Sequence, residues 1–164
     1  MQREDAEAYV CAHHRRLLRS AYLLTGRREA AEDLAQETAV RVLVAWPKVS
    51  RADDREAYVR RTMLHLYLSG RRRAWTTREV PAAHLEAAGT RPAYDVVDDR
   101  DQVLQALRTL PPRQRAAVVL RHYEQLSEAE TAAALGCSSG NIKSLTSRGL
   151  VSLRALLSEE SLHD

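Results

Sequence analysis

The sequence has no phenylalanine, and Lys48 and Lys143 are the only lysines among its 25 basic residues, an imbalance typical of a GC-rich genome. Its 164 residues contain no apolar run near the roughly 18 residues that cross a bilayer. The first residues, MQREDAEAYV, are charged where a secretion signal would be apolar. We therefore expect no membrane span, no export signal and a cytoplasmic location.

Cysteine and catalytic motifs are scarce as well. Cys11 and Cys137 lie 126 positions apart, which fits neither a disulfide framework nor a zinc ribbon. His13 and His14 follow Cys11, but residues 11, 13 and 14 do not share one face of a helix, so no metal site is expected. The chain has no Ser/His/Asp or Cys/His arrangement and no Gly-rich phosphate loop. We expect no enzyme, no cofactor and no small-molecule substrate.

The composition, 45% hydrophobic and 29% charged, predicts a packed protein of one or two small domains. The net charge of +3 permits a polyanionic partner without requiring one. Residues 1–74 carry a net +5, residues 75–101 a net −3 and residues 102–164 a net +1. The acidic segment holds prolines and glycine and lacks helical periodicity. We therefore predict a flexible linker over 76–97 between a first module, residues 1–75, and a second module, residues 98–164.

The first module is predicted to contain helices throughout. Apolar residues recur at helical spacing over 9–24, and Gly26 then favours a left-handed end. A second apolar stripe over 31–45 is expected to stop before Pro47. A polar loop over 48–54 leads to a third helix.

Local sequence signals predict where the third helix begins and where it ends. Asp53 and Glu56 match a capping box at its start. Apolar residues continue through Met63 to Leu66, and we expect the helix to end near Gly70.

The second module is predicted to be helical too. One helix is expected over 99–109, and Pro112 suits the first turn of the next, over 113–123. Because no alternating strand pattern competes anywhere, the predicted fold class is all-α.

A helix-turn-helix pattern completes the second module. Ser127 and Glu130 form a capping box, Gly136 takes the turn, and Ser138 or Ser139 caps the last helix. A helical hairpin with a polar surface is the alternative at this stage. If the pattern binds DNA, its exposed residues can donate to bases and phosphates. These are Ser139, Asn141, Lys143, Ser144, Ser147 and Arg148.

Two charged surfaces mark the first module. Acidic and amide residues gather on the second helix at Glu29, Asp33, Gln36 and Glu37, and arginines end the third helix at residues 71–73. Complementarity to helix dipoles explains the signs of these charges. It does not explain arginines beside Tyr67 and Trp75, a combination suited to phosphates and stacked bases.

Three segments together resemble extracytoplasmic-function (ECF) sigma factors of the sigma-70 family, especially a branch common in actinobacteria. They are "LLRSAYLLTGRREAAEDLAQETAVRVLVAWPKV", "REAYVRRTML" and "LPPRQRAAVVLRHYEQLSEAETAAALGCSSGNIKSLTSRGLVSLRALL". The resemblance implies a non-enzymatic subunit that gives RNA polymerase its promoter specificity and helps to open DNA. It also implies that the first module matches sigma region 2 and the second module matches sigma region 4.

The resemblance assigns partners to each surface. The "EDLAQE" helix would bind the β′ clamp helices of core RNA polymerase, and the second module would meet the β flap. The implied core-binding residues are Asp33, Gln36, Glu37 and Arg41. Many such factors are also held by an anti-sigma protein, which is a further implied partner.

The resemblance likewise assigns promoter DNA. The loop after the second helix would receive a base flipped from the minus-ten element, and the third helix would support the opened strand. The implied residues are Lys48, Ser50, Arg51, Tyr58, Arg60, Arg61, His65, Arg71, Arg72 and Arg73. His65 stands where the family usually has Asn, and Leu68-Ser69 replaces a frequent aromatic pair.

The last helix would read the minus-thirty-five element with Ser139, Asn141, Lys143, Ser144, Ser147 and Arg148. The alternative is a stand-alone helix-turn-helix regulator whose first module senses a ligand or dimerises.

Overall fold

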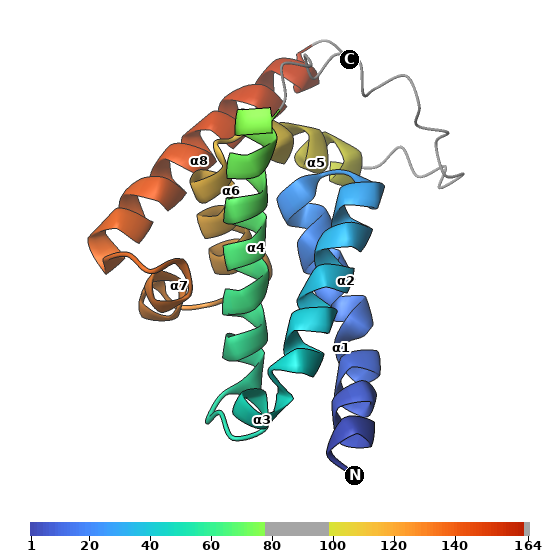
Figure 1. Ribbon diagram of the computed structural model, residues 1–164. Helices are drawn as coiled ribbons and strands as arrows, with labels where there is room; N and C mark the ends of the chain where they lie inside the picture. The colour runs from blue at the N-terminus through green and yellow to red at the C-terminus, as the bar shows by residue number, and fades with distance from the viewer. Residues whose placement is uncertain (78–98, 163–164) are drawn as a thin grey trace.

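The computed structural model describes the backbone of residues 1–77 and 99–162 and the side chains of 1–70, 102–159 and 161–162. Within these ranges the chain forms helices and no strands, so the all-α prediction is confirmed (Figure 1). The helices are α1 Gln2–Thr25, α2 Arg28–Val44, α3 Trp46–Val49, α4 Arg55–Thr77, α5 Asp99–Thr109, α6 Pro112–Val118, the π-helix η3 Val119–Tyr123, α7 Glu128–Leu135 and α8 Ser139–Ser161. The predicted linker falls almost wholly on residues 78–98, outside the described residues.

Several helix boundaries lie where the local signals predict. Gly26 ends α1 with φ of 69°, and Gly136 ends α7 with φ of 66°, both in the left-handed region that glycine tolerates. The Ser127 hydroxyl accepts the backbone N–H of Glu130 at 3.0 Å and caps α7. Ser138 caps α8 in the same way, accepting from the N–H of Asn141 at 3.1 Å.

Three predicted boundaries are wrong. The cap of α4 is Asp54 rather than Asp53, because Asp54 Oδ1 accepts the N–H of Ala57 at 3.0 Å. The loop expected over 48–54 begins with the last two residues of α3, where buried Val49 anchors it to the core. Helix α4 passes through Gly70, because one exposed glycine costs a helix only about 1 kcal/mol.

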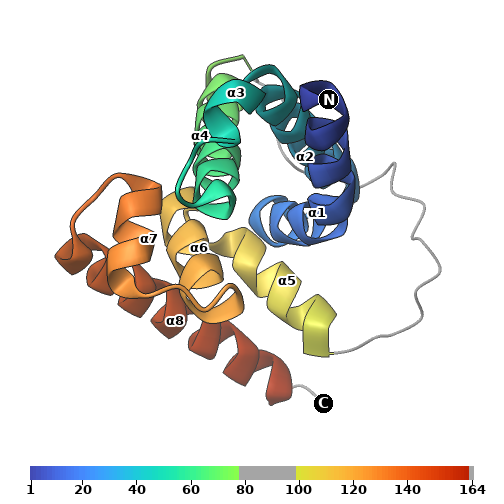
Figure 2. The same cartoon turned by 90° about the horizontal axis from the view of Figure 1, so that it is seen from below.

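One apolar core joins the two modules. It combines Leu24, Leu34, Met63 and neighbours from the first module with Leu120, Ile142 and neighbours from the second. Figure 2 shows α5 and α6 lying beside α1, and α7 facing α4. The division into two separate domains stays a prediction, and in this structure the modules are packed against each other.

Candidate polymerase and nucleic-acid interface

Helix α2 separates a buried face from a polar one. Leu34, Ala35, Thr38 and Val42 are buried, and the Thr38 hydroxyl donates to the carbonyl of Leu34 at 2.7 Å. The four predicted core-binding residues are exposed and fall at helical spacings on the outer side of α2. They are Asp33, Gln36, Glu37 and Arg41. The structure therefore places this predicted set on one accessible surface.

The end of α2 adds apolar residues that the sequence analysis missed. Val40 is 52% exposed and Val44 is 79% exposed, and both continue the row that contains Glu37. Two valines in solvent beside a charged face are suited to a protein partner. The sequence could have identified both valines, because they lie three and seven residues after Glu37 and outside the apolar stripe of the helix.

A hollow opens between the start of α1 and the α3–α4 loop. Its lining includes Tyr9, Trp46, Ser50 and Arg55. The Arg55 guanidinium carbon lies 5.7 Å from the Trp46 ring centroid, and Arg55 Nη2 donates to the Ser50 carbonyl at 3.0 Å. Burial, reinforced by the nearby Glu56 carboxylate, raises the pKa of the Tyr9 phenol above its usual 10.0.

The predicted minus-ten loop residues take different places around this hollow. Ser50 lines it, whereas Lys48 and Arg51 are exposed on the same loop. Tyr58 is half-buried and packs with the cluster that contains Val49, rather than lining the hollow. Sequence reasoning missed Trp46 and Arg55 as lining residues.

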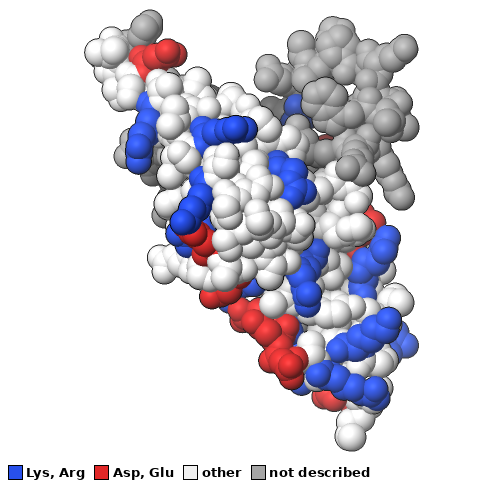
Figure 3. Space-filling model, turned by 90° about the vertical axis from the view of Figure 1, so that its left-hand side faces the viewer, with Lys and Arg blue, Asp and Glu red and all other residues white. Residues whose placement is uncertain are grey.

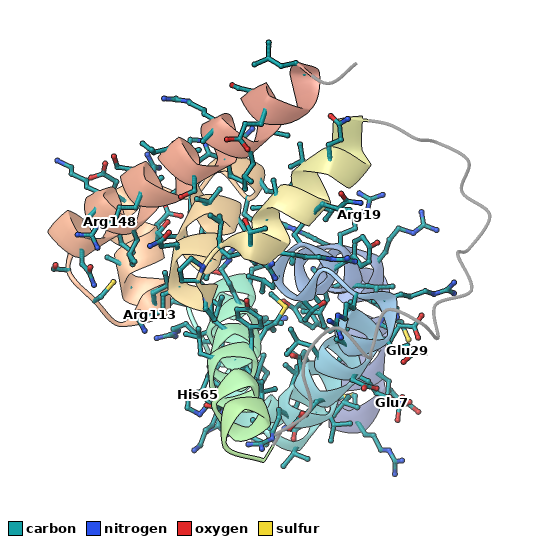
Figure 4. All side chains as sticks on the ribbon, turned by 90° about the horizontal axis from the view of Figure 1, so that it is seen from above. Glu7, Arg19, Glu29, His65, Arg113 and Arg148 are labelled. Atoms are coloured by element: carbon teal, nitrogen blue, oxygen red, sulfur yellow. The ribbon has the colours of Figure 1, made fainter. Side chains whose placement is uncertain are left out.

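The predicted basic residues of α4 do not form one surface. Arg61 and His65 are exposed and lie one turn apart, and Figure 4 shows His65 at the outside of the helix. Arg60 instead turns into the molecule, where its Nε donates to Glu124 Oε2 at 2.7 Å. The side chains of Arg71, Arg72 and Arg73 lie outside the described residues.

Helix α8 presents most of its predicted reading residues to solvent. Ile142 is fully buried and fixes the rotation of the helix. Of the predicted set, Ser144 is half-buried and the others are exposed; these others are Ser139, Asn141, Lys143, Ser147 and Arg148. Figure 4 shows Arg148 on the outer side of α8.

On the face that Figure 3 displays, the described Lys and Arg side chains form no continuous basic patch. Figure 3 shows Lys and Arg side chains spread over the face that it displays, interrupted by a group of Asp and Glu. Lys143, for example, lies 3.9 Å from the Glu128 carboxylate. Non-specific DNA affinity depends on the number of phosphates that cations neutralise, so this surface is suited to weak binding by the free chain.

The described residues contain neither a cluster of metal ligands nor a membrane-spanning helix. They contain no group of three or more His, Cys, Asp or Glu side chains close enough to hold a metal ion. Among the same residues, no helix is both long and apolar enough to cross a bilayer.

The comparisons with known proteins match each of the two modules to a region of one family. Residues 10–77 match sigma-70 region 2, and residues 100–153 match sigma-70 region 4. The chain is 38% identical to an RNA polymerase sigma-E factor of Streptomyces avermitilis over 96% of this chain and 88% of that protein. It is also 38% identical to the sigma-E factor of Streptomyces coelicolor over 92% of this chain and 84% of that protein.

A solved structure shares the whole arrangement. The co-crystal structure of sigma factor RpoE with anti-sigma factor NepR from Bartonella quintana contains a chain that matches with a TM-score of 0.76. The sequences are 25% identical over 94% of this chain and 98% of that chain. The stand-alone regulator is set aside, because the first module also matches a sigma region. The chain therefore belongs to the sigma-70 family, in its extracytoplasmic-function group, and is an RNA polymerase sigma factor.

Proposed function

We propose that the outer face of α2 is the surface by which this sigma factor binds the β′ clamp helices of core polymerase. The observation that carries this proposal is the exposure of a charged row and an apolar end on one helix face. Its residues are Asp33, Gln36, Glu37, Val40, Arg41 and Val44. The charges would guide the docking, and the valines would lose water on contact.

The α3–α4 region is the proposed minus-ten surface. The hollow beside Ser50 receives an extruded base, while Lys48, Arg51 and Arg61 contact the strand backbone. Arg60, which is paired with Glu124 in this structure, contacts the same backbone once that pair opens. Extrusion of a base from the DNA stack costs a few kcal/mol, and a preformed hollow for the base with cations for the strand backbone would offset that cost. His65 supplies a hydrogen-bonding group on the same exposed face of α4. Tyr58 supports the loop from behind, and Arg71, Arg72 and Arg73 extend the basic character of α4 by sequence alone.

Helix α8 is the proposed reader of the minus-thirty-five element. Lys143 and Arg148 are the strongest candidates for base or phosphate contacts, and Asn141 is a candidate for a base edge. Ser139, Ser144 and Ser147 add hydroxyl groups along the helix. Phosphate contacts would set the position of α8, and base contacts would select the sequence. The β flap of polymerase is the proposed site at which the second module is held.

No catalytic step is assigned to this chain, because its work is binding and strand separation. Its partners, core polymerase and the chromosome, put it in the cytoplasm. An anti-sigma factor is a further proposed partner, supported by the related RpoE solved with NepR.

Charge reversal on α2 tests the polymerase surface. We expect the double variant Asp33→Arg with Glu37→Arg to bind core polymerase at least about tenfold more weakly, equivalent to about 1.4 kcal/mol. Pull-down and fluorescence titration with core polymerase measure the binding, and run-off transcription measures the consequence. The matched control is Glu4→Arg with Glu7→Arg on exposed positions of α1. Equal binding by both double variants would contradict the proposed surface.

A further inference from the structure

A buried ion pair connects the two modules. Arg60 of α4 donates from Nε to Glu124 Oε2 at 2.7 Å, and the two side chains are only 13% and 7% exposed. The Ser20 hydroxyl of α1 donates to the other carboxylate oxygen, Oε1, also at 2.7 Å. Both oxygens of Glu124 are thus engaged by first-module residues that lie 64 and 104 positions away in the chain.

The local backbone around Glu124 is unusual. The preceding turn, η3, is a π-helix, and the Glu124 N–H donates to the Val119 carbonyl at 3.0 Å. The next residue, Gln125, has φ of 57°, a conformation that side chains with a Cβ seldom adopt. A π-turn inserts one residue into a helix and shifts the direction of the side chains that follow. Such irregular turns persist where the surrounding structure holds them, and here Glu124 is held between α1 and α4.

A second set of contacts joins the modules about one turn further along α1, at its C-terminal end. Arg115, only 1% exposed, donates to the Leu24 carbonyl, and Arg108 donates to the Gly26 carbonyl. These carbonyls belong to the last turn of α1, where the helix leaves its acceptors unpaired and its dipole is negative. The packed arrangement of the modules is therefore supported by charge as well as by the shared apolar core.

The packing of the modules leaves some of the proposed binding residues exposed and covers others. The polar face of α2 and the reading face of α8 remain exposed, whereas Arg60 is covered. If Arg60 contacts the promoter backbone, as the proposed function holds, then Glu124 occupies the place of a phosphate. A carboxylate that accepts from an arginine uses the same charge-assisted hydrogen bond as a phosphate oxygen.

We propose that the packing of the second module on the first is an autoinhibitory contact, in which Glu124 masks Arg60 from DNA until the modules separate. Core polymerase can dock on the accessible face of α2 first, and Arg60 becomes available only afterwards. The free chain would thus bind DNA poorly for two reasons, its scattered surface charge and its masked arginine. The proposal rests on the proposed DNA-binding role of Arg60.

Glu124→Gln is the informative substitution. It keeps the size of the side chain but removes the charge, leaving the Arg60 guanidinium buried without its carboxylate, which penalises the closed arrangement. The matched control is Glu56→Gln, which changes the net charge identically. Glu56 pairs with Arg16 at 3.2 Å within the first module, where the Arg16 side chain is 59% exposed and the Glu56 side chain 47%.

Single-molecule energy transfer can measure the arrangement in the full chain. Dyes at exposed Cys11 and at Ser152→Cys report the separation of the modules, with Cys137→Ser removing the other thiol. We expect a dominant short-distance population in the parent chain. Glu124→Gln should raise the open-to-closed ratio at least about fivefold, the lower end of typical coupling between sites. An unchanged ratio, or a change equal to that of Glu56→Gln, would overturn the closed arrangement.

Binding to a fluorescent single-stranded oligonucleotide, without polymerase, tests the masking. We expect Glu124→Gln to bind at least about fivefold more tightly than Glu56→Gln. Adding Arg60→Ala should abolish that gain. Glu124→Gln could open the modules while the added Arg60→Ala leaves oligonucleotide binding unchanged. In that case Arg60 does not bind DNA, and the Arg60–Glu124 contact is not inhibitory. If the distances do not shift, the inhibitory arrangement fails while the DNA role of Arg60 can still be measured with polymerase present.

Discussion

Residues of the same type have different roles in this molecule, depending on whether their side chains are buried or exposed. Val42 and Val44 are two positions apart on α2, yet Val42 is 1% exposed and Val44 is 79% exposed. The first contributes to the core, and the second is available to a partner. Substitution of an exposed side chain usually changes stability by less than about 0.5 kcal/mol, so Val44 can be altered to test binding alone.

Val44→Asp is expected to weaken core polymerase binding about tenfold, because a carboxylate would lose water at an apolar contact without a partner. Titration of labelled sigma factor with core polymerase measures the affinity, and urea unfolding checks that stability is unchanged. Val151→Asp is the matched control, because Val151 is 61% exposed on α8, away from the α2 face. A loss of affinity in the control alone would show that the apolar contact with polymerase lies on α8 and not on α2.

Lys143→Ala on α8 distinguishes sequence reading from phosphate positioning. If Lys143 contacts a base, the variant should lose about 1–3 kcal/mol of discrimination at one position of the upstream element. Selection of promoters from a randomised library by the holoenzyme measures the preference at each position. Arg154→Ala, at another exposed position of α8, is the control. An equal loss on every sequence, with a smaller salt slope, would identify Lys143 as a phosphate contact.

At the scale of elements, the crossing of α6 and α8 depends on a glycine. A Cβ built on Gly149 would lie 2.6 Å from Val118 Cγ2 and 3.6 Å from the Gln114 carbonyl oxygen. Val118 is buried and β-branched, so it has little freedom to move aside. The close approach sets how α8 lies on its module.

Gly149→Ala should therefore destabilise the protein by about 1–3 kcal/mol, the usual cost of overpacking a filled core. A Cβ built on Gly140, in the same helix, would lie 4.0 Å from Ser138 Oγ, an ordinary contact, so Gly140→Ala should be neutral or stabilising. Urea denaturation of both variants measures the difference. Equal stabilities would mean that Val118 can move aside at little cost.

Local signals predicted the helices well, and long-range packing explains what they missed. The caps at Gly26, Ser127 and Gly136 depend on neighbours within a few residues, and the sequence contains those neighbours. Helix α3 was missed because Trp46 and Val49 turn into a core whose other members lie elsewhere in the chain.

In the candidate site, too, local features could be predicted from the sequence and long-range contacts could not. Helical spacing predicted the shared face of Asp33 and Glu37, since that face depends on the period of one helix. The masking of Arg60 could not be predicted, because its partner Glu124 is 64 positions away and depends on a π-turn. Their roles in binding stay predictions.

At the scale of the whole molecule, the shared core links the folding of the two modules. Leu24 and Met63 pack in the same cluster as Leu120 and Ile142, so separation of the modules would expose apolar surface from both. Arg115 contributes from the middle of this contact, donating to Leu24 in the first module and to Leu107 in the second. The free chain is therefore expected to unfold as one cooperative unit.

Replacing Arg115 tests that coupling. Arg115→Met keeps apolar volume but removes the Arg115 donor from the Leu24 carbonyl, which costs about 1–3 kcal/mol for an unsatisfied buried group. The Leu107 carbonyl also loses Arg115 but keeps the N–H of Leu110 at 3.1 Å. Tryptophan fluorescence, which reports Trp46 and Trp75 of the first module, and far-ultraviolet circular dichroism, which reports all helices, should coincide in urea for the parent chain. In Arg115→Met the two transitions should move to lower urea and separate. Transitions that are already separate in the parent chain would show that the modules fold independently and that the shared core couples them weakly.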